Sequence, residues 1–183
     1  MDKMHPSQIP VKLEPYNPDW VLRFQAARDE IMKHLGHVFD DVQHFGSTSI
    51  DGMVAKPTID MLAGTWQFPW DEGHDQHLEK IGFKFYKANH DRWRVYLKPH
   101  QDKVRGYHLH VVEYGSEHWL NHLLFRDYLR QHPEDAAEYA FVKLRLAQSE
   151  SVRTGGRGAY QLGKKDVVQK IMQKAVRWRE EAL

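Results

Sequence analysis

The chain has 183 residues, of which 41% are hydrophobic and 28% charged, and its 26 Lys and Arg nearly balance 25 Asp and Glu, giving a net charge of +1. So small a net charge excludes a molecule-wide basic field that would recruit nucleic acid, and we expect no nucleic-acid partner. The lack of cysteine excludes disulfides, thiolate catalysis and cysteine-bound zinc or iron–sulfur sites, and it favours a cytoplasmic location.

The length fits one globular domain, residues 1–183. The N-terminal sequence has no signal-peptide core, and no apolar run approaches the roughly 18 residues that span a bilayer, so we expect no membrane segment. Residues 1–19 contain four of the eight prolines and predict an extended arm. Apolar residues then recur at helical spacing from Trp20 to about Leu35, which predicts the first helix.

Strands dominate the next part of the chain. Alternation of apolar and polar residues, with glycine and proline between the runs, predicts strands over residues 38–45, 58–63, 83–87, 92–98 and 107–113. Short helices are predicted over residues 47–53 and 74–81, with a loop over residues 66–71 between them. Strands that follow one another this closely, with few helices between them, favour a short mixed sheet.

The last third, residues 116–183, is predicted to be helical. Helices are expected over residues 116–131 and 133–150, a glycine-rich break over residues 154–158, and a final helix over residues 160–182. The predicted fold class is therefore α+β, a short mixed β-sheet flanked by helices with a helical C-terminal third.

A small polar turn, Gly46-Ser47-Thr48-Ser49, directly follows the first predicted strand. Glycine allows close approach of the backbone to a ligand, and free amides at a helix start, with the three hydroxyls, suit a phosphate. The same four residues also occur in ordinary strand-to-helix turns, and this alternative stays open.

Asp60 lies in an apolar run, where an unpaired charge costs several kcal/mol, so it needs a cation or a hydrogen-bond partner. The twelve residues between Ser47 and Asp60 are enough to leave one strand and return in its neighbour. Lys56 could add a cation at the mouth of such a site, or it could be a solvated loop lysine.

Two histidines at i and i+2, His108 and His110, share one side of the last predicted strand. With Asp60 they would form a set of two imidazoles and one carboxylate, which suits Mn, Fe or Zn better than Mg alone. Glu113 is a further candidate metal ligand, although strict alternation puts it on the opposite face and a bulge would be needed. The alternative is that both histidines are hydrogen-bonded sheet residues.

Three cations share one face of the strand over residues 92–98: Arg92, Arg94 and Lys98. Crowded cations favour an anionic guest such as a nucleotide, or else a charged edge strand that resists aggregation. Three basic residues of the later helices are expected to be mostly surface charges: Arg126, Arg130 and Lys143.

The chain resembles the GrpB family over roughly residues 12–175. The segments that carry the resemblance are LEPYNPDW, HFGSTSIDGMVAKPTIDML, RWRVYLK, HLHVVEYGSEHW, LLFRDYLRQHPEDAAEYAFVKLRLA and YQLGKKDVVQKI. The resemblance implies the fold of DNA polymerase β-like nucleotidyltransferases, in which a glycine–serine turn holds a nucleoside triphosphate and strand carboxylates hold two Mg²⁺ ions. Gly46 and Ser47 match the turn, and Asp60 matches one metal carboxylate.

The sequence departs from that pattern at the second acid of the strand, because Thr58 and Leu62 stand two residues to either side of Asp60. We hypothesise a metal-dependent nucleotidyltransferase that uses a divalent metal, Mg or Mn, at Asp60, His108 and His110. The partner would be a nucleoside triphosphate or another phosphorylated small molecule. The alternatives are a catalytically degenerate nucleotide-binding module and a metal-dependent phosphoesterase.

Overall fold

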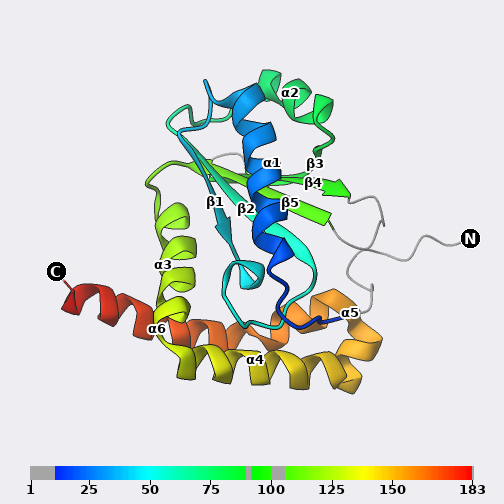
Figure 1. Ribbon diagram of the computed structural model, residues 1–183, viewed down its shortest axis with the longest axis vertical. Coiled ribbons are helices and arrows are strands. Elements are labelled where there is room, and N and C mark those ends of the chain that lie inside the picture. The colour runs from blue at the N-terminus through cyan, green and yellow to red at the C-terminus, as the bar shows by residue number, and fades with distance from the viewer. Residues whose placement is uncertain (1–10, 90–91, 100–105, 183) are drawn as a thin grey trace, which may run out of the picture.

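The computed structural model describes residues 11–89, 92–99 and 106–182, and in these ranges a five-stranded mixed sheet is flanked by helices (Figure 1). The strands are β1 (Asp41–Phe45), β2 (Thr58–Thr65), β3 (Lys84–Asn89), β4 (Trp93–Pro99) and β5 (Gly106–Glu113). Their order in the sheet is β1-β2-β5-β4-β3; β2 and β5 are parallel, and the other neighbours are antiparallel. The predicted fold class is confirmed.

Helices occupy both sides of this sheet and its lower end. In chain order they are α1 (Asp19–Leu35), η2 (Ser47–Ser49), η3 (Glu72–His74), α2 (Asp75–Lys80), α3 (Glu117–Gln131), α4 (Pro133–Gln148), α5 (Glu150–Gly163) and α6 (Lys165–Glu181). In Figure 1, α1 crosses the sheet, and α4, α5 and α6 lie together beyond the lower end of α3. Among the described residues, no helix combines the length and the apolarity needed to cross a membrane.

The two faces of the sheet are covered by different helices. Odd-numbered residues of β2 and β5, such as Met61 and Leu109, belong to the core cluster that includes Ile31 of α1. Even-numbered residues point the other way, where Leu62 and Val112 pack with Phe45 and with Trp119 of α3 in a smaller cluster. We call these the α1 face and the α3 face. Asp60, His108 and His110 have even numbers and therefore lie on the α3 face.

Local sequence explains most helix boundaries. Ser116 accepts a hydrogen bond from the Trp119 amide at 3.3 Å and so caps α3, and Pro133 occupies the first turn of α4. The arm described from residue 11 onward is joined to the connector after η2 by paired hydrogen bonds between Glu14 and Ala55. The first ten residues of the predicted arm lie outside the described residues.

Three predicted elements differ from the structure. The short helix predicted over residues 47–53 is only the single turn η2. The glycine-rich break predicted over residues 154–158 is present but shorter: α5 consists of two helical segments that meet in a kink at Gly156 (φ 57°, ψ −141°). The final helix begins at Lys165 rather than near residue 160, since α5 extends to Gly163.

Candidate functional site

The sheet register brings one acid and two imidazoles together on the α3 face. Asp60 of β2 is paired with His108 of β5, and His110 is the next residue of β5 on the same face. One ligand atom from each of the three lies within 4.8 Å of the others, and His108 Nδ1 lies 3.1 Å from Asp60 Oδ1. About a third of the Asp60 and His108 side chains remains exposed, so the group is open to a ligand.

The charges of this group suit metal binding. Burial acts to raise the pKa of Asp60, but the hydrogen bond to His108 and the charges of the two histidines and Lys56 outweigh it and hold the pKa below its ordinary value. Burial lowers the pKa of His110 to about 3, helped by neighbouring histidines and opposed by Asp60. Near neutral pH the group therefore offers a carboxylate and a neutral imidazole, the forms that bind metals.

The glycine of the polar turn lies directly against the acid. Gly46 has φ 72° and ψ −174°, and a Cβ built on it would lie 2.7 Å from Asp60 Oδ2. Phe45, the residue before it, is paired with Asp60 across β1 and β2. Glycine is thus required at position 46 for two reasons, the positive φ and the close approach of Asp60. The turn and the acid therefore belong to one site.

The hydroxyls of the turn do not all face a ligand. Thr48 Oγ1 lies 3.0 Å from His44 Nε2 and donates to the Thr58 carbonyl at 3.3 Å, and Ser49 Oγ donates to the Gly46 carbonyl at 2.6 Å. Both residues are buried. These two hydroxyls therefore hold the turn against its own backbone and the neighbouring strands, whereas the Ser47 hydroxyl accepts a hydrogen bond from Lys143 of α4.

Two arginines of α3 hold this turn from outside. Arg126 Nη1 donates to the His44 carbonyl at 2.9 Å, and Arg130 Nε and Nη2 donate to the Ser49 carbonyl at 3.0 and 2.7 Å. The expectation of surface charges was wrong for Arg126, which is buried, because α3 packs across β1 and turns this side chain onto backbone carbonyls. Both arginines also contact Asp127, as their spacing predicts.

A buried lysine of α4 contacts the turn and was not predicted. Lys143 is only 2% exposed, and its Nζ donates to Ser47 Oγ at 2.8 Å and to the Val54 carbonyl. Burial, helped by the charges of Lys164 and Lys56 and opposed by Asp60, lowers the pKa of Lys143 to about 7. It was taken for a surface charge because helical periodicity does not show which helix face the turn covers.

Other predicted residues lie elsewhere. Arg94 and Lys98 have side chains on the α1 face: Arg94 contacts Glu72 and Asp75 at 3.1 Å each, and Lys98 contacts Glu30 at 2.6 Å. The β4 residues paired with His110 and His108 are Val95 and Leu97. Arg94 and Lys98 occupy the alternate positions, so their side chains point away from the two histidines.

Two more predicted residues are not brought into the group. Arg92 is exposed in the turn that precedes β4. Glu113 is the exposed last residue of β5, where it is paired with Thr65, and its odd number puts it on the other face from His110 with no bulge between β2 and β5. Within the described residues, the one group that could hold a metal contains Asp60, His108 and His110.

Two further histidines of α3 approach this group. The His122 ring lies 6.4 Å from the His110 ring and 4.4 Å from the His118 ring, and its edge contacts Phe45. Burial lowers the pKa of His118 to about 4. The sequence analysis did not single out His118 and His122. Their i, i+4 spacing was the signal that could have identified them, since it puts both on one face of a helix.

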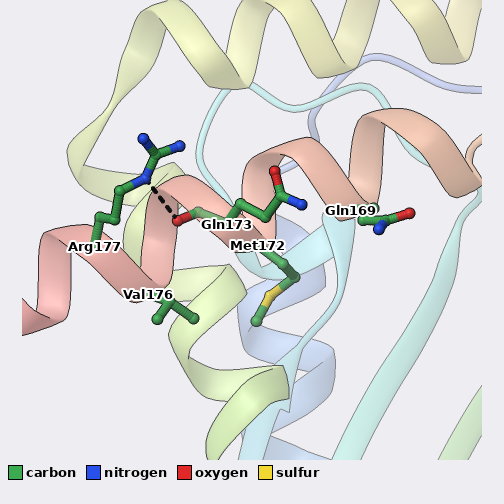
Figure 2. A pocket seen from close by; sticks show the side chains of 5 residues that line it. All are labelled: Gln169, Met172, Gln173, Val176 and Arg177. Carbon is green, nitrogen blue, oxygen red and sulfur yellow. Dashed lines mark hydrogen bonds between the residues drawn. The ribbon is translucent and has the colours of Figure 1, made fainter.

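A hollow of about 530 Å³ on the surface of α6 is lined by Gln169, Met172, Gln173, Val176 and Arg177 (Figure 2). All five residues come from one helix, and Arg177 donates to the Gln173 carbonyl of its own helix at 3.3 Å. The lining contains no acid or histidine, so this hollow offers no metal ligands of the kind gathered at Asp60.

Comparison with known sequences shows which proteins are similar. A family model described as "GrpB protein" matches residues 10–174. The UPF0157 protein YqkA of Bacillus subtilis is 32% identical over 170 residues, covering 93% of this chain and 48% of YqkA, so the chain spans about half the length of that relative. The glutamate-rich protein GrpB of Alkalihalophilus pseudofirmus is 31% identical over 142 residues, covering 75% of this chain and 82% of that protein.

Solved structures show the same fold. Conserved protein GrpB from Enterococcus faecalis superposes with a TM-score of 0.81 at 27% identity, covering 92% of this chain and 99% of that one. Cid1 poly(U) polymerase gives a TM-score of 0.55 at 14% identity over 75% of this chain and 45% of its own. The CdnE c-di-GMP synthase of Capnocytophaga granulosa gives 0.52 at 11% identity over 90% and 68%. The fold is that of nucleotidyltransferases.

Proposed function

The chain belongs to the GrpB family, and from that premise we propose that it is a metal-dependent nucleotidyltransferase acting on a nucleoside triphosphate. The observation that carries the proposal is the contact between the Gly46 turn and Asp60, which puts a phosphate seat and a metal ligand side by side. We further propose that the protein works in the cytoplasm and has no nucleic-acid partner, with the acceptor left open.

The residues fit a divalent metal. Ligand atoms bound to one ion at about 2.0–2.2 Å lie roughly 3–3.5 Å apart. The contact between His108 and Asp60, at 3.1 Å, already meets this spacing, and His110 lies within 4.8 Å of both. Because two of the three donors are imidazoles, we propose Mn²⁺ over Mg²⁺ as the preferred ion. When bound, the metal would neutralise charge on the α-phosphate and its leaving group.

The chain's own groups would position the substrate. The backbone at Gly46 and the Ser47 hydroxyl would bind phosphate oxygens, and Lys143 would orient Ser47 through the hydrogen bond it already donates. In the reaction, an acceptor oxygen would form a bond to the α-phosphorus as the bond to pyrophosphate breaks, and the acceptor proton would pass to solvent or to a nearby imidazole. Arg126 and Arg130 would act only by holding the turn in place.

One observation favours a second candidate. Within the described residues Asp60 is the one carboxylate of the metal group, whereas the two-metal reaction uses several. A nucleotide-binding module without transfer would need no more than this. The two functions differ in one product, because only transfer releases pyrophosphate.

The test uses Mn²⁺ binding and pyrophosphate release by the full chain. We expect Asp60→Asn to weaken Mn²⁺ binding by about a hundredfold or more, since it removes the charged ligand. Electron paramagnetic resonance of the free ion measures this binding. The control is Glu113→Gln, which removes an acid of the same strand outside the group and should bind Mn²⁺ like the wild type.

Pyrophosphate release from ATP with a pool of hydroxyl acceptors would support transfer. ATP binding without release would support the binding module, and free phosphate from simple esters would support a phosphoesterase. Unchanged Mn²⁺ binding in Asp60→Asn would refute the metal site.

A further inference from the structure

We propose that the helical part of the chain carries a polyphosphate-binding subsite next to the turn, which makes a phosphate chain rather than a single phosphate the ligand. We use the name basic pocket for a cluster of five side chains: Lys56, Lys143, Arg157, Lys164 and Tyr160. This inference rests on the proposed function, because Lys143 of the pocket contacts Ser47 of the turn.

Tyr160 of α5 is the centre of the pocket. It is 1% exposed, and the Nζ atoms of Lys164 and Lys56 lie 4.7 and 5.6 Å from its ring centroid. Two ammonium groups share one aromatic ring, which attracts cations but cannot neutralise them. Among the described residues no acid forms an ion pair with either lysine, so a bound anion would neutralise them.

Two polar atoms of the basic pocket are buried and have no hydrogen-bond partner among the described residues: Tyr160 Oη and Arg157 Nε. Buried polar atoms are nearly always satisfied in folded proteins, so two unsatisfied donors three residues apart on one helix call for an explanation. Both atoms are donors, and a phosphate oxygen accepts from such donors. An anion in the pocket would satisfy both.

The charges in the pocket are not balanced. Lys164 and Lys56 act to lower the pKa of Lys143, and Arg157 acts to lower that of Lys56, in each case after burial as the larger cause. Among the interactions that favour the charged lysines, the one from an acid is that of Asp60, which the metal group already uses. The free protein thus holds an excess of positive charge, and an anion would be stabilised there.

The number of cations favours a chain of phosphates. A single phosphate ester carries about −1.5 to −2 at pH 7, less than the charge that the four basic side chains can carry when an anion is bound. The cations also extend away from the turn, from Lys143 at Ser47 to Lys164 and Lys56 at the Tyr160 ring. Two or three linked phosphates match both the charge and this extension.

The kink in α5 belongs to the same pocket. Gly156 is buried with φ 57°, and it immediately precedes Arg157 and lies one turn before Tyr160. It therefore sets the direction in which both side chains leave the helix. The predicted glycine-rich break is thus the kink that orients these two side chains.

The test is calorimetric titration of the full chain with sodium tripolyphosphate, pyrophosphate and orthophosphate at pH 7 in EDTA. We expect affinity to rise with the length of the phosphate chain. Lys164→Met and Tyr160→Phe should each weaken tripolyphosphate binding, the first by about ten- to a hundredfold as for a lost charged hydrogen bond. The control Lys165→Met changes the adjacent exposed lysine and should bind like the wild type.

Several outcomes would overturn the inference. They are equal affinity for orthophosphate and tripolyphosphate, wild-type binding by both Lys164→Met and Tyr160→Phe, or an equal loss in Lys165→Met. Circular dichroism of each variant checks its folding, and Tyr160→Phe changes a single oxygen. Asp60→Asn separates the two proposals, because it should lose Mn²⁺ and still bind tripolyphosphate at least as tightly as the wild type.

Discussion

Two regions of the molecule bury cations in opposite ways. On the α1 face, Arg94 of β4 is 4% exposed and each part of its guanidinium has a partner: Tyr96 at 3.0 Å, Glu72 at 3.1 Å and Asp75 at 3.1 Å. In the basic pocket, Lys143 is 2% exposed, and its hydrogen-bond acceptors in the described part of the chain are two uncharged oxygens. The first arrangement stabilises the fold by itself, and the second needs a ligand.

The pKa values show the same contrast. For Arg94, burial acts to lower the pKa, but the partners prevail and the pKa is raised. For Lys143 and Lys164, burial prevails and the pKa falls to about 7 and about 8. The charge of Arg94 is thus paired within the fold. Among the described residues no acid forms an ion pair with Lys143 or Lys164, and such perturbed groups are typical of functional sites.

The largest expected effect on stability concerns Arg94, whose charge is paired within the fold. Arg94→Met should lower the free energy of unfolding by about 2–3 kcal/mol, less than the 3–5 kcal/mol typical of a broken buried pair because Glu72 is largely exposed. Asp75 keeps donors from Trp70 and Tyr96, which also limits the loss. Urea unfolding measures it, and tripolyphosphate binding should not change. A loss of tripolyphosphate binding with stability unchanged would reverse the comparison.

The second-largest expected effect concerns the contact between Gly46 of the turn and Asp60. Gly46→Ala should cost about 2 kcal/mol, from backbone strain at φ 72° and from the clash with Asp60, and it should weaken Mn²⁺ binding. Gly52→Ala is a matched control, because Gly52 also has φ 72° but a Cβ there would have no neighbour within 4 Å. It should cost about 1 kcal/mol and leave Mn²⁺ binding intact. Equal Mn²⁺ affinities in the two variants would separate the turn from the metal group.

The basic pocket gives an effect of opposite sign. Lys164 has a folded pKa of about 8, below its ordinary value of 10.5, so its charge destabilises the fold fully below pH 8, and this penalty vanishes as pH rises through 10.5. Lys164→Met should therefore stabilise the free protein by about 1 kcal/mol at pH 6–7, with no gain near pH 11. Thermal unfolding across this pH range measures it, with Lys165→Met as control. A destabilised variant at pH 6–7 would show that Lys164 is paired.

Much of the fold follows from local sequence. The alternation that predicted strands and the helical spacing of Trp20, Ile31 and Leu35 act within a few residues, and the structure confirms those elements within a few positions. The sequence also predicted that Asp60 and His108 lie together, because an acid in an apolar strand needs a partner on a neighbouring strand. Whether these residues catalyse a reaction remains a prediction.

The basic pocket did not follow from the sequence. Lys143 belongs to α4 and Ser47 to the turn after β1, so their contact depends on how α4 packs against the sheet. No periodicity within either segment records that packing. The reverse error occurred at Arg94 and Lys98, where the shared face was predicted correctly but the side of the sheet was not, because alternation gives the faces of a strand without saying which helix covers each.

The smallest expected effect tests that error directly. Lys98 contacts Glu30 of α1 at 2.6 Å, with side chains 23% and 42% exposed, so Lys98→Met should cost less than about 1 kcal/mol and the cost should shrink further in high salt. Urea unfolding at low and high ionic strength measures this. The affinity of Lys98→Met for tripolyphosphate should equal that of the wild type, because Lys98 points to the α1 face, away from Asp60. A tenfold weaker affinity would mean that the cations of β4 do reach the ligand, and the division between a paired region and a ligand-binding region would no longer hold.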